Sequence, residues 1–247
     1  MSGHSRWESP GFIRGEDVKD TTYYDPKAEV NLCVDMALLT IRDGALSVLL
    51  VKRVYPPFKN CWALPGGYIN VDESAEESVR RELLEETGVD LDNAYLEQLR
   101  TYTAPKRDPR GRIVSVAYVA FAPIQQELRP SNETSDVRWW TVEDLFSEDA
   151  PALAFDHEQI IKDALERCRS KLEYTTLATE FLTEPFSIGD LRRIYEAVWN
   201  TKLTQSNFHR KVKSISGFLV PVGESGKATL YRVGDHGLIS PPIMREP

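Results

Sequence analysis

The chain has 247 residues, of which 41% are hydrophobic and 28% are charged, a composition typical of a folded protein and not of a disordered or fibrous one. No apolar run approaches the ~18 residues of a membrane span, and residues 1–17 contain no stretch like a secretory signal, so we expect a cytoplasmic chain with no membrane partner. The net charge of -8 argues against a generally basic nucleic-acid coat protein, and three scattered cysteines predict neither a disulfide frame nor a zinc site.

The charge is unevenly distributed along the chain. Residues 1–180 carry 21 basic and 32 acidic side chains, whereas residues 181–247 carry nine basic and six acidic ones. Opposite net charges in two parts of one chain indicate two domains with different partners.

The N-terminal part combines strand and helix patterns. We treat the polar residues 1–27 as an extension. Four segments have the composition of β-strands, namely residues 30–41, 46–51, 113–121 and 137–141. The first two flank an Asp-Gly turn and predict a hairpin. Residues 74–87 are predicted to form a helix. Ser74 and Glu77 would form a capping box at its start, and Gly88 would end it.

The last turn of this predicted helix carries three uncompensated carboxylates, Glu82, Glu85 and Glu86. Their i, i+3, i+4 spacing places them on one face, where each like-charge pair costs roughly 0.2–0.5 kcal/mol. A cation would remove this repulsion, and hard oxygen ligands suit Mg²⁺ or Mn²⁺, which also bridge phosphate oxygens. The carboxylates therefore predict a metal site for a pyrophosphate-bearing ligand, with a solvated acidic helix face as the alternative for an arbitrary ExxEE pattern.

The spacing around these carboxylates resembles the Nudix box, a glycine, five residues, a glutamate, seven residues and then REUxEExGU. Every fixed position is filled, by Gly67, Glu73, Arg81, Glu82, Leu83, Glu85, Glu86, Gly88 and Val89. The resemblance implies that the three carboxylates bind metal, that Glu82 is the catalytic base for water, and that Glu73 and Arg81 form an ion pair that supports the loop. The implied chemistry is metal-assisted attack of water on a nucleoside diphosphate linked to another group.

Further segments resemble the ADP-ribose branch of the Nudix superfamily, namely residues 51–53, 62–69, 107–118 and 133–140. Four arginines and two glycines become candidate ligand-binding residues: Arg53, Gly66, Gly67, Arg107, Arg110 and Arg112. The arginines can pair with ligand phosphates or with a dimer partner, and a turn stabilised by Asp108 and Pro109 is an equal alternative. Glu133 or Asp136 could add a carboxylate to the metal site but are more readily explained as loop residues, and His157 is interpreted as structural.

The C-terminal part is predicted to be helical and then to end in a hairpin. Asp156 is predicted to cap a connector helix over residues 156–172. Further helices are predicted at 173–182, at 190–198 after a Ser187 cap and at 205–214 after a Thr204 cap, with hairpin strands at 218–222 and 228–233. Side chains able to bind phosphates and base edges lie on the third of these helices and at the hairpin tip: Gln205, Ser206, Asn207, His209, Arg210, Lys211, Lys213 and Lys227.

This order of elements is typical of a winged helix-turn-helix that reads DNA, although a solvated basic face and a protein-interaction module are alternatives. Over residues 28–235 the chain resembles the Nudix-related transcriptional regulators of NAD metabolism, the NrtR family. The resemblance implies an α+β chain with a Nudix domain (α/β/α sandwich, mixed sheet) at 28–155, the connector at 156–172 and the winged domain at 173–247.

The same resemblance implies a homodimeric repressor of NAD biosynthesis or salvage genes that binds a palindromic DNA operator and senses ADP-ribose with Mg²⁺ or Mn²⁺. Many members of the family have degraded Nudix boxes and have lost catalysis, while this box is intact. Whether the chain is an enzyme is therefore left open, and a Mg-dependent ADP-ribose pyrophosphatase whose tail serves assembly is the alternative function.

Overall fold

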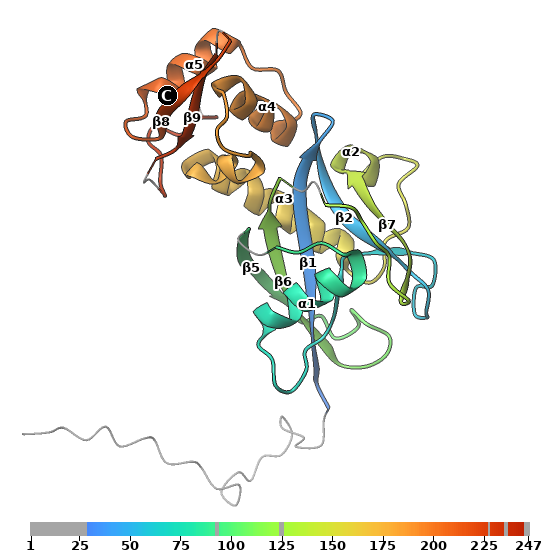
Figure 1. Cartoon of the computed structure of the whole chain (residues 1–247). Coiled ribbons are helices and arrows are strands. Elements are labelled where there is room, and N and C mark those ends of the chain that lie inside the picture. Colours follow the sequence, from blue (N-terminus) through green and yellow to red (C-terminus); the bar gives the residue numbers. More distant parts are fainter. Residues whose placement is uncertain (1–28, 92–93, 124–125, 227, 235–236, 245–247) are drawn as a thin grey trace, which may run out of the picture. The chain divides into compact units, whose positions relative to one another are not determined.

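The computed structural model describes residues 29–91, 94–123, 126–226, 228–234 and 237–244 (Figure 1). The N-terminal extension predicted at 1–27 and the predicted DNA-binding Lys227 lie outside the described residues. Residues 31–247 are one compact unit. No helix among the described residues is both long and apolar enough to cross a membrane.

A seven-stranded mixed sheet is built around β1, which pairs with β2 in an antiparallel and with β6 in a parallel direction. Strand β5 continues the sheet beyond β6, β3 and β7 pair with β2, and β4 pairs with β1. The strands are β1 (Asn31–Arg42), β2 (Ala45–Arg53), β3 (Trp62–Ala63), β4 (Gly66–Tyr68), β5 (Tyr95–Tyr102), β6 (Ile113–Phe121) and β7 (Thr134–Thr141).

Local sequence signals account for the first hairpin and the first helix. The β1–β2 turn has Asp43 and Gly44 in the left-handed region, with φ of 49° and 79°, as the predicted turn requires. Helix α1 (Ala75–Thr87) begins with the predicted capping box of Ser74 and Glu77. It ends at Gly88, with φ 74°, whose N–H donates to the Leu84 carbonyl at 2.9 Å. These predictions are confirmed.

Helices cover both faces of the sheet, so the predicted α/β/α sandwich is confirmed (Figure 1). Alternate side chains of β1 divide between the two layers, because successive residues of a strand point to opposite faces. Val34 and Met36 belong to the buried cluster of α1, whereas Ala37 and Leu39 belong to that of α3 (His157–Tyr174). Between strand β7 and α3 lies the short helix α2 (Val142–Leu145).

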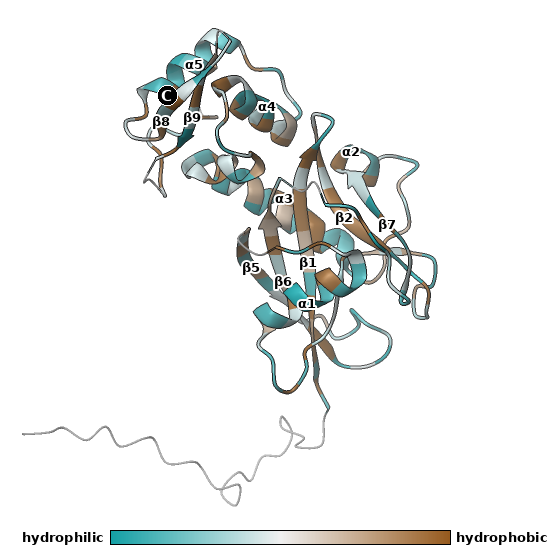
Figure 2. Ribbon diagram, in the orientation of Figure 1, coloured by the Kyte–Doolittle hydropathy of each residue, from teal (hydrophilic) through white to brown (hydrophobic). Residues whose placement is uncertain are grey.

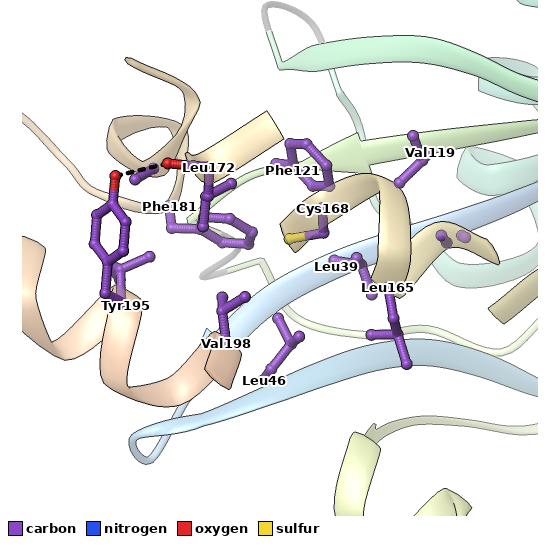
Figure 3. Packing of buried hydrophobic residues seen from close by; sticks show 14 of the residues in the cluster. Leu39, Leu46, Val119, Phe121, Leu165, Cys168, Leu172, Phe181, Tyr195 and Val198 are labelled. Atoms are coloured by element: carbon purple, nitrogen blue, oxygen red, sulfur yellow. Dashed lines mark hydrogen bonds between the residues drawn. The ribbon is translucent and has the colours of Figure 1, made fainter. Parts of the chain in front are cut away.

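A winged helix forms the C-terminal part, as predicted. It comprises α4 (Ile188–Trp199), α5 (Gln205–Ser214), β8 (Leu219–Ser225) and β9 (Ala228–Val233). The two helices pack through apolar side chains, including Tyr195, Phe208 and Val212, whereas the rest of α5 is hydrophilic (Figure 2). Buried side chains from the sheet, α3 and α4 form one continuous cluster (Figure 3).

Three local predictions for the C-terminal part are wrong. Asp156 and Thr204 precede their helices but make no capping hydrogen bond, and the Asp156 carboxylate binds an arginine instead. The helix predicted at 173–182 does not form, because α3 ends at Tyr174 and a 3-10 helix, η1 (Thr176–Phe181), follows. The Thr175 hydroxyl explains this break, since it accepts from Leu177 N–H and starts a new turn.

Candidate functional site

A pocket lies where β1, β4 and α1 meet the loops that follow β2 and β5 and the residues that precede α3. Eight of the predicted site residues line it: Arg53, Gly66, Gly67, Arg81, Glu82, Glu86, Arg107 and Arg110. The remaining predicted residues of the Nudix region do not line the pocket. Glu73 and Glu85 pair with the lining residue Arg81, and Arg112 donates to the Thr103 carbonyl. The loop after β2 and the start of α3 thus converge on the Nudix-type helix.

Glu86 is a carboxylate of α1 that lines the pocket beside the backbone of β4. Its Oε2 accepts a hydrogen bond from Gly66 N–H at 3.0 Å. Burial, together with the neighbouring charges of Glu82 and Glu133, raises the pKa of Glu86 to about 8. Burial also raises the pKa of Glu82, although the ion pair with Arg81 opposes this shift. For both groups burial outweighs the nearby positive charge, which is Arg81 for Glu82 and Arg53 for Glu86.

Glu133, which the sequence pattern favours as a loop residue over a metal ligand, also lines this pocket. Its charge raises the pKa values of Glu82 and Glu86, which puts it in electrostatic contact with both. Asp136, the other residue considered, instead pairs with Arg138 at 3.1 Å. The carboxylates of Glu82, Glu86 and Glu133 suit a divalent cation, because Mg²⁺ and Mn²⁺ prefer oxygen ligands.

The carboxylates are not gathered at one point. Arg81 Nη1 lies 2.8 Å from Glu82 and 3.0 Å from Glu85, so it holds these two side chains by ion pairs. Accordingly, no group of three acidic, histidine or cysteine side chains among the described residues stands ready to hold a metal. A cation would have to compete with Arg81 for Glu82, while Glu85 remains outside the pocket lining.

The loop before α1 is held by the predicted ion pair of Glu73 and Arg81. The contact is bidentate, with Arg81 Nε 2.9 Å and Nη2 2.6 Å from the two oxygens of Glu73. A second bond of Glu73, accepted from Asn70 N–H at 2.8 Å, closes the loop. These bonds, chiefly those from Arg81, lower the pKa of Glu73 to about 2. These bonds tie the loop to α1.

The two glycines of β4 are required by close packing. A Cβ at Gly66 would lie 2.1 Å from the backbone oxygen of Val34 on β1. At Gly67 a Cβ would lie 2.3 Å from Oε1 of Glu82. Glycine thus lets β4 approach β1 at one position and lets the Glu82 carboxylate rest on the backbone at the next.

Two arginines of the pocket pack against the ring of Phe155. The guanidinium of Arg53 lies 4.9 Å and that of Arg110 lies 5.5 Å from the centroid of this ring. Burial first, and then the charge of Arg110, lower the pKa of Arg53. Asp108 fixes Arg110 through a contact of 2.6 Å. A pair of cations with a single carboxylate partner favours an anionic ligand such as a diphosphate.

Arg107 and Arg112 have different surroundings from those two arginines. Arg112 donates to the Thr103 carbonyl at 2.6 Å and does not line the pocket. The Arg107 side chain is only 2% exposed. Its Nη2 lies 2.7 Å from Asp156 and 3.3 Å from Asp35. Arg107 therefore organises the pocket floor with carboxylates of the chain itself.

Asp35 is the centre of this floor and was missed in the sequence, although it is the one charged residue in the apolar run of β1. His157 Nδ1 accepts from Leu64 N–H at 2.8 Å, so its other nitrogen, 3.3 Å from Asp35, carries the proton. Burial opposes ionisation of Asp35, yet His157 and Arg107 hold its pKa below the usual value. The structural interpretation of His157 agrees with these bonds.

The second candidate site is the outer face of α5. The predicted DNA-binding residues of this helix are exposed except Lys211, which is half-buried, whereas Phe208 and Val212 are buried. The exposed set is Gln205, Ser206, Asn207, His209, Arg210 and Lys213. Arg210 donates to the Asn207 side chain at 3.3 Å. The helix thus presents a polar and basic face of ten residues' length.

The profile of the NUDIX domain family matches residues 32–164, and that of the NrtR DNA-binding winged helix domain matches residues 178–233. The chain is 36% identical over 211 residues to the ADPR responsive transcriptional repressor NtrR of Acinetobacter baylyi, covering 81% of either chain. The chain belongs to the NrtR family. Within this family it keeps the Nudix box in full, as its sequence predicts.

Solved structures agree with the NrtR assignment. A MutT/nudix family protein from Enterococcus faecalis has a TM-score of 0.75 and 32% identity, over 85% of this chain and 88% of that chain. NrtR of Shewanella oneidensis complexed with a 27mer DNA has a TM-score of 0.68 and 37% identity, over 82% and 93%. Its NUDIX domain complexed with ADP ribose has a TM-score of 0.53 and 42% identity, over 59% and 94%.

One curated relative is an enzyme. The ADP-ribose pyrophosphatase of Methanocaldococcus jannaschii is 41% identical over 116 residues, which cover 47% of this chain and 64% of that protein. The similarity thus covers less than half of this chain.

Proposed function

We propose that this chain is a cytoplasmic transcriptional repressor of NAD biosynthesis or salvage genes, which binds DNA as a homodimer and is released by ADP-ribose. The observation that carries the proposal is the presence, in one compact unit, of a pocket with paired arginines and carboxylates and of an exposed basic α5. The relatives named above support it, because one is an ADPR-responsive repressor and another was solved with DNA.

The ADP-ribose diphosphate would bind between the two arginines that flank Phe155 and the carboxylates of α1. Glu82 and Glu86, with Glu133, would hold Mg²⁺ or Mn²⁺, while Glu85 is the predicted ligand with the weakest claim because it lies outside the lining. When bound, the metal would neutralise the carboxylates and bridge phosphate oxygens. The Glu73–Arg81 pair would keep the loop in place during binding.

The operator would be read by α5 in the major groove, with the hairpin of β8 and β9 beside it. Residues 173–247, which include α4 and α5, would be the DNA-binding domain, residues 28–155 the sensor, and 156–172 the connection. Because residues 181–247 carry only three more basic than acidic side chains, two subunits on a palindrome would be needed for strong binding.

A mobility-shift titration tests this proposal. The purified full chain is titrated onto its own upstream region and onto promoters of NAD-biosynthesis genes at low salt, with and without ADP-ribose. We expect salt-sensitive binding that ADP-ribose weakens. Absence of binding to all of these fragments would refute DNA-binding repression. If the chain instead bound a protein partner under the same conditions, the winged part would be a protein-interaction module.

A second candidate function is ADP-ribose hydrolysis to AMP and ribose 5-phosphate, with the winged part serving assembly. The intact Nudix box favours it, as does the similarity to the archaeal pyrophosphatase. In this reaction Glu82 would be the base for water, although it is held by Arg81 in the structure. Metal-dependent turnover by the full chain, lost in Glu86→Gln and without operator binding, would establish the enzyme in place of the repressor.

A further inference from the structure

The first residue of α3 and the two residues before it belong to the ligand pocket or bind it. Phe155 and His157 line it, and Asp156 between them binds the pocket residue Arg107 through both oxygens, at 2.7 and 3.0 Å. Phe155 also has φ of 52°, in the left-handed region that costs a non-glycine residue of order 1–3 kcal/mol. The pocket therefore holds the start of α3 through three consecutive residues, one of them strained.

The last turns of α3 belong to the winged part. The hydroxyl of Tyr195 on α4, which is fully buried, donates to the Leu172 carbonyl at 2.8 Å (Figure 3). Arg169 Nε donates to the Val198 carbonyl at 3.3 Å. Beyond the hairpin, the N–H of Ile239 donates to a carbonyl of this last turn at 2.8 Å. Polar and apolar contacts thus fasten α3 to α4 and to the segment that follows β9.

Between these ends α3 is a continuous helix of 18 residues, about 27 Å long. Seven of its side chains are buried, and the contacts include both the sheet and the winged part. A regular helix transmits a displacement of its first turn to its last, because its backbone hydrogen bonds leave little freedom between them. The helix thus joins the pocket, at its first turn, to α4 of the winged part, at its last turns.

We propose that the Arg107–Asp156 ion pair is a latch through which the pocket controls α3 and, with it, the winged part. A diphosphate that draws on Arg107 would compete with Asp156, and release of Asp156 would let the start of α3 move. The proposal rests on the proposed ADP-ribose function.

The surroundings of the ion pair favour release of Asp156, and not of Asp35, from Arg107. The Asp156 side chain is 24% exposed, so water can solvate it after release, whereas Asp35 is 8% exposed. Arg107 would keep Asp35 as a counter-charge and would not be left buried without one. Arg53 and Arg110 pack on Phe155. If they moved toward a ligand, the strained Phe155 would lose these contacts.

Asp156→Asn tests the latch, because it keeps the size of the side chain and removes its charge. We expect the variant to bind ADP-ribose and to bind the operator in its absence with the weaker affinity of the ligand-bound wild type. The ratio of operator Kd values with and without ADP-ribose, commonly 5–150-fold in allosteric proteins, should fall below about twofold. A variant that binds ADP-ribose and keeps the wild-type ratio overturns the proposal.

Asp108→Asn is the matched control. Asp108 also pairs with a pocket arginine, Arg110, at 2.6 Å, but within the described part of the chain it forms no hydrogen bond or ion pair with α3. The loss of its charge should weaken ADP-ribose binding. At saturating ADP-ribose, the ratio of operator Kd values with and without ligand should remain as in the wild type. A ratio lowered equally in both variants would mean that any loss of pocket charge uncouples the sites, which contradicts a specific latch.

Hydrogen exchange on the unmodified chain decides the matter if Asp156→Asn loses ADP-ribose binding or does not fold. ADP-ribose should accelerate exchange in the first turn of α3, residues 157–160, since this turn is freed from the pocket. Unchanged or slower exchange there overturns the latch. If ADP-ribose leaves operator binding by the wild type unchanged, the proposed function is refuted. This result differs from refutation of the latch, in which ADP-ribose still weakens operator binding by the wild type.

Discussion

The two adjacent glycines of β4, Gly66 and Gly67, should have different effects when each is replaced by alanine. In Gly67→Ala the new Cβ would lie 2.3 Å from Glu82 Oε1, about 1 Å closer than an ordinary contact. The atom it meets is the free end of a side chain, so the carboxylate can move and the fold should be little affected. A displacement of ~1 Å in a site group can cost on the order of 100-fold in function, and we expect a loss of 10–100-fold in metal-dependent ADP-ribose affinity.

In Gly66→Ala the Cβ would meet backbone instead, at 2.1 Å from the Val34 oxygen and 3.0 Å from Asp35 Cα. Strands β1 and β4 would have to separate, and overpacking of this kind typically costs about 1–3 kcal/mol. For a chain of this size that corresponds to a Tm lowered by roughly 2–12 °C. Gly66→Ala should therefore lose stability, and Gly67→Ala should lose ligand affinity.

Thermal unfolding followed by calorimetric titration of ADP-ribose with Mg²⁺ separates the two effects. Gly223→Ala is a suitable control, because a Cβ at this position on the winged hairpin would meet nothing within 4 Å. Wild-type ligand affinity in Gly67→Ala would refute the place assigned to Glu82 in the metal site. A Gly66→Ala protein as stable as the control would refute the packing argument.

Three further predictions concern other parts of the molecule. Tyr195→Phe removes the buried bond to the Leu172 carbonyl and should cost about 1 kcal/mol, or roughly 2–4 °C in Tm; an unchanged Tm in calorimetry would contradict it. Because burial and neighbouring carboxylates raise the pKa of Glu86 to about 8, a cation must displace its proton below that pH. Metal affinity should then rise by up to ~10-fold per pH unit from pH 6 to about 8 and level off above that pH. Calorimetric titrations in two buffers should show the release of a proton on metal binding, and a metal affinity that does not change with pH would refute this prediction. Arg210→Ala and Lys213→Ala should each weaken operator binding and lower the salt slope by about 0.9 per lost phosphate contact, whereas unchanged slopes would exclude these contacts.

Patterns of adjacent residues predicted much of the fold, since capping and turns are local. The capping box of Ser74 and Glu77, the Asp43-Gly44 turn and the bounds of α5 need no information from distant residues. Strand β5 was not predicted, because its sequence YLEQLRTY alternates poorly and only two of its eight residues are buried. Its pairing with β6 outweighs this weak propensity.

The pocket was predicted in part, from the Nudix box and from three arginines outside it, Arg53, Arg107 and Arg110. Spacing places Glu82 and Glu86 together because both lie on one helix, but Asp35 and Phe155 reach the pocket from other elements. No spacing rule relates those elements to α1, so tertiary packing alone identifies these residues. Arg107 shows a related limit, since its charge is seen in the sequence while its carboxylate partners are not.

The measurement that tests the account most directly is the operator affinity of the full chain with and without ADP-ribose, in the presence of Mg²⁺. The account predicts binding to an NAD-gene promoter that saturating ADP-ribose weakens at least fivefold, within the usual range of allosteric coupling. Operator binding that ADP-ribose leaves unchanged, or no operator binding beside rapid ADP-ribose hydrolysis, would contradict it.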